Sequence, residues 1–171
     1  MANAIIKSSD TLLASLAECY ITIPVIDTKT GKETGAKNRY NFMQAINLEA
    51  KFEKQKIEVP RLGSVTKGNR SVSLKLTGSA TFHYNSSIFR KIILDFQNTG
   101  RDIYFDIRII NNDKTSAAGK QEIILKDCNI DNGTIAKFDA NGQILDEQMN
   151  FTFESFKMPK EFSMLLGMEV A

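Results

Sequence analysis

The sequence predicts a mainly β fold, a β-sandwich or partly open barrel of about eight strands with one flanking α-helix. The first observation is a long alternating segment from Val72 to Tyr84, in which every second residue is apolar or small and most residues between them are polar. A period of two is typical of a strand with one buried face. The second observation is composition, because Phe and β-branched residues are frequent and favour sheet.

The segment after this strand predicts the helix. Its apolar residues Phe89, Ile92, Ile93 and Phe96 follow the i, i+3, i+4, i+7 spacing of one helix face. Side-chain oxygens at residues 85–87 can cap its start, and Gly100 can end it in the left-handed conformation. Because such a helix has one apolar face to bury, we expect it to pack on the sheet.

The N-terminal half predicts an arm, two strands and two loops. Residues 1–18 form a polar arm with a short apolar end, and residues 19–27 alternate as a strand. Residues 28–38 are polar and contain glycine, which predicts an exposed loop. Residues 40–52 are rich in helix formers, but their alternation favours a strand. Residues 54–70 are densely charged and predict an extended loop between two long strands.

The C-terminal half predicts four further strands. Residues 102–110 form one strand, and residues 121–130 form another with a bulge near Asp127, where the alternation slips. The Asp-Asn-Gly sequence at 131–133 predicts a hairpin turn, with a return strand over residues 134–140. The last strand covers residues 148–156, and Pro159 ends it.

The sequence therefore predicts one β domain over residues 19–162, with an extended loop at residues 54–70, between an N-terminal arm of residues 1–18 and a C-terminal tail of residues 163–171. The inward-facing positions of the strands and the helix predict the core. Its expected members are Val72, Leu74, Leu76, Phe82, Phe89, Ile92, Ile93, Phe96, Phe105, Ile107, Phe151 and Phe153.

The charges are separated along the chain although the total is only +2. Residues 49–75 hold seven basic and three acidic residues, and residues 121–171 hold four basic and nine acidic ones. Opposite charge in separate regions suits self-association. The two cysteines, Cys19 and Cys128, lack metal-site spacing and indicate a reducing compartment. We find no signal peptide or membrane segment, so synthesis and folding in a cytoplasm are expected.

The sequence offers no group of residues for catalysis. His83 is the one histidine, on the polar face of a strand, and an exposed or structural role is the simplest interpretation. Asp146 and Glu147 are adjacent in a strand and point to opposite faces, so they cannot act as an acid–base pair. Residues 127–133 resemble a calcium loop only superficially, and no phosphate-binding glycine motif occurs. We therefore expect no enzyme activity, cofactor or metal.

The charged segment at residues 54–70 is the candidate functional region. Three interpretations remain open: a protein–protein contact, which we favour, a solvated loop, or a nucleic-acid contact. Its candidate contact residues are Lys54, Lys56, Glu58, Arg61, Lys67 and Arg70. The flanking strands would each run about 40 Å at about 3.3 Å per residue. One chain of this size cannot cover both, and bare strand edges call for a partner, which points to a self-assembling β protein.

Three segments carry a family resemblance. KIEVPRLG, KGNRSVSLKLTGSATFHYNSSIFRKIILDFQNTGRDIYFDIRI and GKQEIILKDCNIDNGTIAKFDANGQILDEQMNFTFESFKMPKEF are similar to the tail tube proteins of contractile-tailed phages, defective prophages and phage-tail-like bacteriocins. The similarity covers about residues 40–162, and the segment at 24–38 is longer than in compact members.

The resemblance implies a tail-tube fold whose six copies form a ring around a channel, with rings stacking into the inner tube of a contractile tail. It further implies that residues 54–70 act as a stacking loop. The implied partners are the sheath, baseplate and tail terminator proteins. The particle is either a phage, whose DNA would pass through the channel without specific binding, or a bacteriocin that carries no DNA. The implied location is a virion tail or tail-like particle. The alternative is a small β-barrel nucleic-acid-binding module that uses the basic segment.

Overall fold

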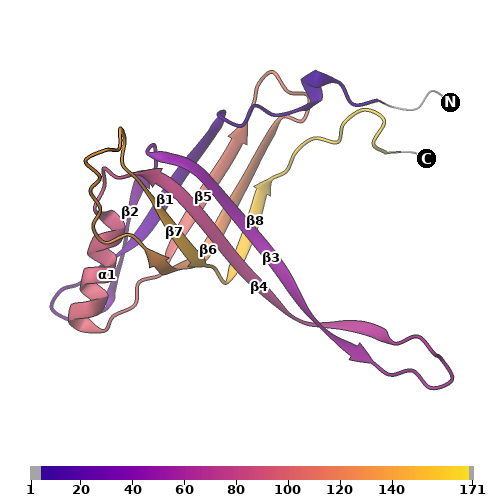
Figure 1. The fold of residues 1–171 in the computed structure, drawn as a ribbon, viewed down its shortest axis with the longest axis horizontal. Helices are drawn as coiled ribbons and strands as arrows, with labels where there is room; N and C mark the ends of the chain where they lie inside the picture. The colour runs from indigo at the N-terminus through magenta and orange to yellow at the C-terminus, as the bar shows by residue number, and fades with distance from the viewer. Residues whose placement is uncertain (1–4, 170–171) are drawn as a thin grey trace.

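The computed structural model describes residues 5–169, and in them eight strands and one α-helix follow a short 3-10 turn at Ser8–Asp10. Figure 1 shows the arrangement. The elements are β1 (Ala17–Ile26), β2 (Glu33–Asn41), β3 (Ala45–Val59), β4 (Gly68–His83), α1 (Ile88–Thr99), β5 (Phe105–Asn112), β6 (Lys120–Gly133), β7 (Asp146–Thr152) and β8 (Ser155–Lys160). No described helix is long and apolar enough to cross a membrane.

All strand pairs are antiparallel, in the order β2-β1-β5-β6-β7-β4-β3, with β8 paired to β6 outside this path. The long strand β6 joins two sheets. Its first part pairs with β5 and β8, and its last residues pair with β7. A bulge separates the two parts, and Asp127 there has a φ of 55°, a left-handed value that Asp tolerates well. The predicted bulge near Asp127 is therefore confirmed.

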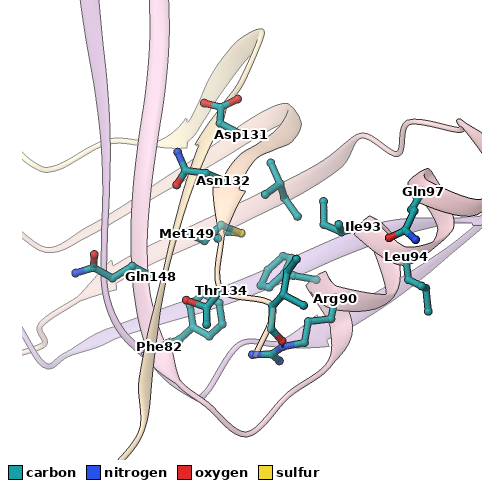
Figure 2. Close-up of a pocket in the computed structure, with 14 residues that line it drawn as sticks. Phe82, Arg90, Ile93, Leu94, Gln97, Asp131, Asn132, Thr134, Gln148 and Met149 are labelled. Atoms are coloured by element: carbon teal, nitrogen blue, oxygen red, sulfur yellow. The ribbon is translucent and has the colours of Figure 1, made fainter. Parts of the chain in front are cut away.

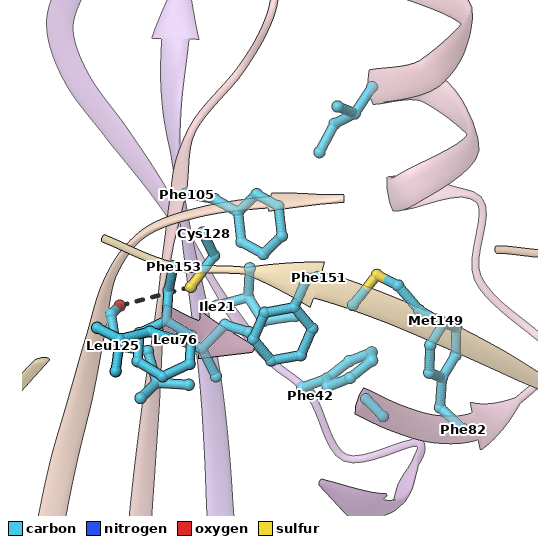
Figure 3. Packing of buried hydrophobic residues seen from close by; sticks show 13 residues of the cluster. Ile21, Phe42, Leu76, Phe82, Phe105, Leu125, Cys128, Met149, Phe151 and Phe153 are labelled. Atoms are coloured by element: carbon cyan, nitrogen blue, oxygen red, sulfur yellow. Dashed lines mark hydrogen bonds between the residues drawn. The ribbon is translucent and has the colours of Figure 1, made fainter. Parts of the chain in front are cut away.

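One hydrophobic core joins the two sheets. Ile21, Ile107 and Leu125 come from the sheet that contains β1, β5 and β6, and Ala80 and Phe151 come from the sheet that contains β4 and β7 (Figure 3). Of the expected core, eight residues lie in this cluster or pack against it: Leu76, Phe82, Phe89, Ile92, Phe105, Ile107, Phe151 and Phe153. The core therefore forms where the apolar faces of the two sheets meet.

Gly78 permits a close contact in this core. It pairs directly with Phe151 across β4 and β7, and the Phe151 ring lies against its backbone. A Cβ atom on Gly78 would lie 2.3 Å from the ring, closer than atoms can approach. The register of β4 shows no irregularity at this residue, so the bulge that a glycine in a strand can indicate is absent here.

Helix α1 packs on the core through Phe89. Its ring lies 5.6 Å from the ring of Phe42, 5.5 Å from Phe82 and 5.7 Å from Phe105, measured between centroids, within the range of favourable aromatic pairs. Gly100 ends the helix with a φ of 69°, and its N–H donates to the carbonyl of Phe96, as the sequence predicts.

Two loop predictions in the N-terminal half are wrong. Residues 33–38, expected in a loop, belong to β2, an edge strand whose side chains are all exposed and therefore show no hydrophobic pattern. Residues 54–59 and 68–70, also expected in a loop, extend β3 and β4, so the true loop covers only residues 60–67. Both strands are exposed there, and the loop begins at Pro60, which cannot donate a ladder hydrogen bond.

Three strand predictions need correction. The strand expected at 40–52 is broken by a turn, in which the N–H of Ala45 donates to the carbonyl of Phe42. Residues 131–133 do not turn, because β6 continues through them beside β7, and residues 134–140 form no strand. The closing strand is two strands, β7 and β8, which belong to different sheets, and Pro159 lies inside the edge strand β8.

Four residues expected in the core are exposed in the single chain: Val72, Leu74, Ile93 and Phe96. Ile93 and Phe96 lie on α1 near the buried Ile92. The face that the helix buries is therefore narrower than the spacing of its apolar residues predicts. Val72 and Leu74 lie on the part of β4 that has left the sandwich. Among residues 5–169, nothing covers the side chains of Val72 and Leu74.

Candidate assembly interface

The hairpin of β3 and β4 projects from the sandwich, as Figure 1 shows. We call residues 52–75 the distal hairpin. Except for Gly68, every residue in it is exposed, so neither face of the ribbon is covered by described residues. A two-stranded ribbon is marginally stable alone, so this one depends on its continuity with the sandwich strands.

An apolar stripe continues from the core onto the distal hairpin. Leu76 pairs with Phe52, and Leu74, two residues along the same strand, pairs with Lys54, so all four side chains share one face. Leu76 is 8% exposed, whereas Leu74 is 51% and Phe52 is 71% exposed. Val72 follows on β4, where a register shift between Gln55 and Lys56 marks a bulge. The stripe therefore has the pattern of a core face and nothing covering it.

The six contact candidates all lie on the distal hairpin. Lys54, Lys56 and Glu58 are on β3, Arg61 and Lys67 are in the loop, and Arg70 is on β4. Lys67 forms an exposed ion pair with Glu58 at 2.8 Å. Among the described residues the other four basic candidates form no ion pair, so the hairpin carries unneutralised positive charge.

The hairpin tip presents two bare apolar side chains. Leu62 and Val65 are fully exposed, on either side of Gly63, whose φ of 74° requires the freedom of glycine. The hydroxyl of Ser64 accepts a hydrogen bond from the N–H of Thr66 at 3.2 Å. This local bond orders the turn and leaves both apolar side chains outward.

The outer faces of the two sheets differ in chemistry. The sheet of β1, β5 and β6 carries ion pairs, between Lys126 and Asp106 at 2.8 Å and between Arg108 and Glu122 at 2.6 Å. The hydrogen bond to Arg108 lowers the pKa of Glu122. The sheet of β4 and β7 carries His83 and Asp146 at one end of its outer face and, beyond them, uncharged hydroxyls and amides in directly opposed pairs, which are Thr77 and Thr152, Ser79 and Asn150, and Thr81 and Gln148.

The buried carboxylate of Asp113 holds the N-terminal segment against the β5–β6 turn. It accepts hydrogen bonds from the hydroxyl of Thr115 at 2.6 Å, the N–H of Thr115 at 2.9 Å and the N–H of Leu13 at 3.0 Å. These bonds, led by the Thr115 hydroxyl, lower the pKa of Asp113. The C-terminal segment meets the same turn, since the N–H of Ser163 donates to the carbonyl of Ala118.

The histidine and the two cysteines show no sign of a catalytic role. His83 lies 2.8 Å from Asp146 on the outer face of the β4–β7 sheet. Burial raises the pKa of both Cys19 and Cys128 to about 12, so neither is a reactive thiolate at neutral pH. Within residues 5–169 no three metal-binding side chains gather in one place.

The comparisons with known proteins agree with this architecture. The family model for the phage tail tube protein matches residues 4–160. The phage-like element PBSX protein XkdM of Bacillus subtilis is 35% identical over 116 residues, which cover 68% of this chain and 79% of that protein.

Two solved structures of an extracellular contractile injection system share the fold. A chain in the structure of the sheath/tube terminator has a TM-score of 0.61 at 10% identity, and the match covers 88% of this chain and 97% of that one. A chain of the sheath–tube complex has a TM-score of 0.58 at 11% identity and covers 86% and 90%. The chain therefore belongs to the phage tail tube protein family, and its function is that of a structural tail tube protein.

Proposed function

We propose that the protein assembles into hexameric rings that stack into the inner tube of a contractile phage tail or tail-like particle. The observation that carries this proposal is the uncovered apolar stripe of Phe52, Val72 and Leu74, which continues the core face beyond the sandwich. Such a stripe on a projecting hairpin is an aggregation hazard unless another copy covers it. The anti-feeding prophage baseplate, which shares the fold with a TM-score of 0.55, is described as 6-fold symmetrised, which supports six copies.

The distal hairpin is the contact between rings in this proposal. It is long, it projects from a rigid sandwich, and it carries the basic residues Lys54, Lys56 and Arg61. The C-terminal third of the chain carries a net negative charge. Complementary charge on separate regions of one chain orients head-to-tail contacts between copies.

The hydroxyl and amide face of β4 and β7 lines the channel in this proposal. Its opposed pairs, such as Ser79 with Asn150, are uncharged and lie at the surface of the single chain. A wall of this kind offers little to bind a passing chain, including DNA. In assembled tubes, a Ser79→Cys variant should react with a small maleimide and resist a bulky one. Equal reaction with both reagents would place this face outside the channel.

The further partners of the tube are the sheath around it, a baseplate and a terminator at its ends. The solved structures that share the fold come from a baseplate, a sheath–tube complex and a terminator, which supports this set of partners. The protein would be made in the bacterial host cytoplasm and function in the particle.

Sedimentation and electron microscopy of the purified protein test the assembly. We expect hexameric rings or tubes whose fraction rises with protein concentration. A species that stays monomeric at high concentration and forms no tubes contradicts the proposal. A monomer that binds oligonucleotides with a steep salt dependence would instead support a nucleic-acid-binding module.

A charge reversal tests the role of the distal hairpin. The variant Lys54→Glu, Lys56→Glu and Arg61→Glu should block tube growth while leaving the circular dichroism of the subunit unchanged, because all three side chains are exposed. The matched control reverses three exposed lysines near β2, Lys29, Lys32 and Lys37, and should still form tubes. Tubes of normal length from the hairpin variant would remove these charges from the stacking contact.

A further inference from the structure

We propose that a groove between α1 and the end of β6 receives the hairpin tip of a second copy, an inference that rests on the proposed tube assembly. The groove has a volume of about 340 Å³ and is mostly apolar. Figure 2 shows Ile93 and Leu94 on its helix side and Phe82 and Met149 among the strand residues. Ile130 and Ile135 belong to the side formed by β6 and the loop after it.

One half-buried arginine fixes the walls of the groove. The Nε of Arg90 donates to the carbonyl of Ile135 at 2.8 Å, and its other nitrogens donate to the carbonyl of Ser86 and the carboxylate of Glu147. Arg90 therefore ties the loop after β6 to the helix and to β7. Because its charge is matched by Glu147, the groove does not gain a free positive charge. A site fixed before binding loses less entropy when its ligand enters.

The occupant cannot be the hairpin of the same chain. Figure 1 shows α1 and the hairpin tip at opposite ends of the molecule. A knob at one end and a hole at the other produce a head-to-tail contact, which forms closed rings or open stacks rather than a two-fold dimer. This is the type of contact that a tube requires along its axis.

The hairpin tip is complementary to the groove in apolar character and in charge. Leu62 and Val65 are fully exposed apolar side chains on a narrow turn. Asp131 lines the groove and forms no ion pair among the described residues, and the same holds for Arg61 beside Leu62. The approach of Arg61 to Asp131 would set the orientation while the apolar side chains fill the groove.

Cysteine cross-linking in assembled tubes tests the contact. The variant Leu62→Cys with Leu94→Cys should give a ladder of covalent multimers after mild oxidation, while each single variant should not. The control pairs Leu62→Cys with Met164→Cys, an exposed apolar residue of the C-terminal segment. Tubes that cross-link through Met164 and not through Leu94 would overturn the groove and leave tube assembly standing.

Substitutions inside the groove give a second measurement. Leu94→Glu and Ile135→Glu should each raise the concentration needed for tube growth by about tenfold or more, which corresponds to about 1.4 kcal/mol. Both side chains are exposed in the subunit, so its fold should not change. Phe138→Glu, in the same loop but outside the groove, is the control and should assemble normally. Normal assembly of both groove variants would overturn the inference.

A charge exchange tests the orientation of the contact. Arg61→Glu should weaken tube growth, and adding Asp131→Arg should restore it. The contact between these two residues would be contradicted if the double variant formed no tubes while each single variant formed them normally. If the wild-type protein forms no tubes, the proposed function itself fails, and that outcome is visible before any variant is made.

Discussion

The two halves of β4 carry the same alternation of apolar and polar residues and have opposite surroundings. From Leu76 to Phe82 the apolar face is buried against β7 and the opposite sheet. From Asn69 to Lys75 the strand is exposed, although Val72 and Leu74 continue the apolar face. Leu74 and Leu76 differ by two positions on one strand, yet only Leu76 belongs to the core.

The difference teaches that a hydrophobic period identifies a face to be buried without identifying the chain that buries it. In the proximal half the second layer comes from the same chain. In the distal half it would come from another copy, as the proposed tube requires. The free energy of burying Leu74 would then stabilise the assembly rather than the subunit.

The largest effect on the subunit should come from the closing strand of the core. Phe151 is fully buried against Gly78 and Phe153, so Phe151→Ala should lower the free energy of unfolding by about 3–5 kcal/mol. Thr152→Ala, on the opposite face, should cost less than about 1 kcal/mol. Denaturant unfolding of a monomeric variant measures both. Equal losses would mean that both faces of β7 are buried, and a larger loss at Thr152 would reverse the register.

The two leucines of β4 test the comparison itself. In a monomeric variant, Leu76→Ala should lower the unfolding free energy by about 2–4 kcal/mol, and Leu74→Ala by less than about 1 kcal/mol. In the wild-type background, Leu74→Ala should instead raise the concentration needed for tube growth. If the two substitutions destabilise the monomer equally, then the distal half of β4 is covered within the chain, and the comparison fails.

Gly78 gives a smaller effect of the opposite kind, from excess volume. A Cβ at this position would overlap the Phe151 ring, so Gly78→Ala should cost about 1–3 kcal/mol through displacement of that ring. The measurement is again denaturant unfolding, with Gly63→Ala excluded as a control because of its positive φ. Ser79→Ala, on the outer face, is the proper control. A neutral Gly78→Ala would show that the Phe151 ring moves aside more easily than the core packing implies.

The smallest effect concerns pH. Because the pKa of Asp113 is lower in the folded chain than in the unfolded one, its contribution to stability is present above the ordinary carboxyl pKa of about 4 and is lost as the pH falls through the folded value. Glu122 follows the same sign. Asp113→Asn should therefore make stability depend less on pH in the acid range. Unfolding curves at successive pH values measure this, and an unchanged pH slope would contradict it.

Elements with an apolar face could be predicted from the sequence, and strands exposed on both sides could not. The alternation at 72–84 and the helix spacing at 88–99 mark buried faces, and both elements are present. The edge strand β2 and the outer ends of β3 and β4, at residues 54–59 and 69–70, are exposed on both sides, and their polar and charged residues give no clear signal of a strand. Turn chemistry also misled at 131–133, where pairing with β7 overrides the preference of Asp-Asn-Gly for a turn.

Parts of the candidate interface could not be predicted because they depend on distant residues. The contact candidates were identified from charge and position, but the groove requires α1, β6 and β7 to meet. Arg90 and Glu147, which fix it, are 57 positions apart in the sequence. Nothing local in either segment indicates that the two residues pair.

A cryo-electron microscopy reconstruction of tubes formed by the wild-type protein tests the central claim most directly. It would show whether Phe52, Val72 and Leu74, exposed in the single chain, are covered in the assembly. We expect a neighbouring copy to bury all three side chains, with the distal hairpin spanning from one ring to the next. Tubes in which this stripe remains in contact with solvent would contradict the account.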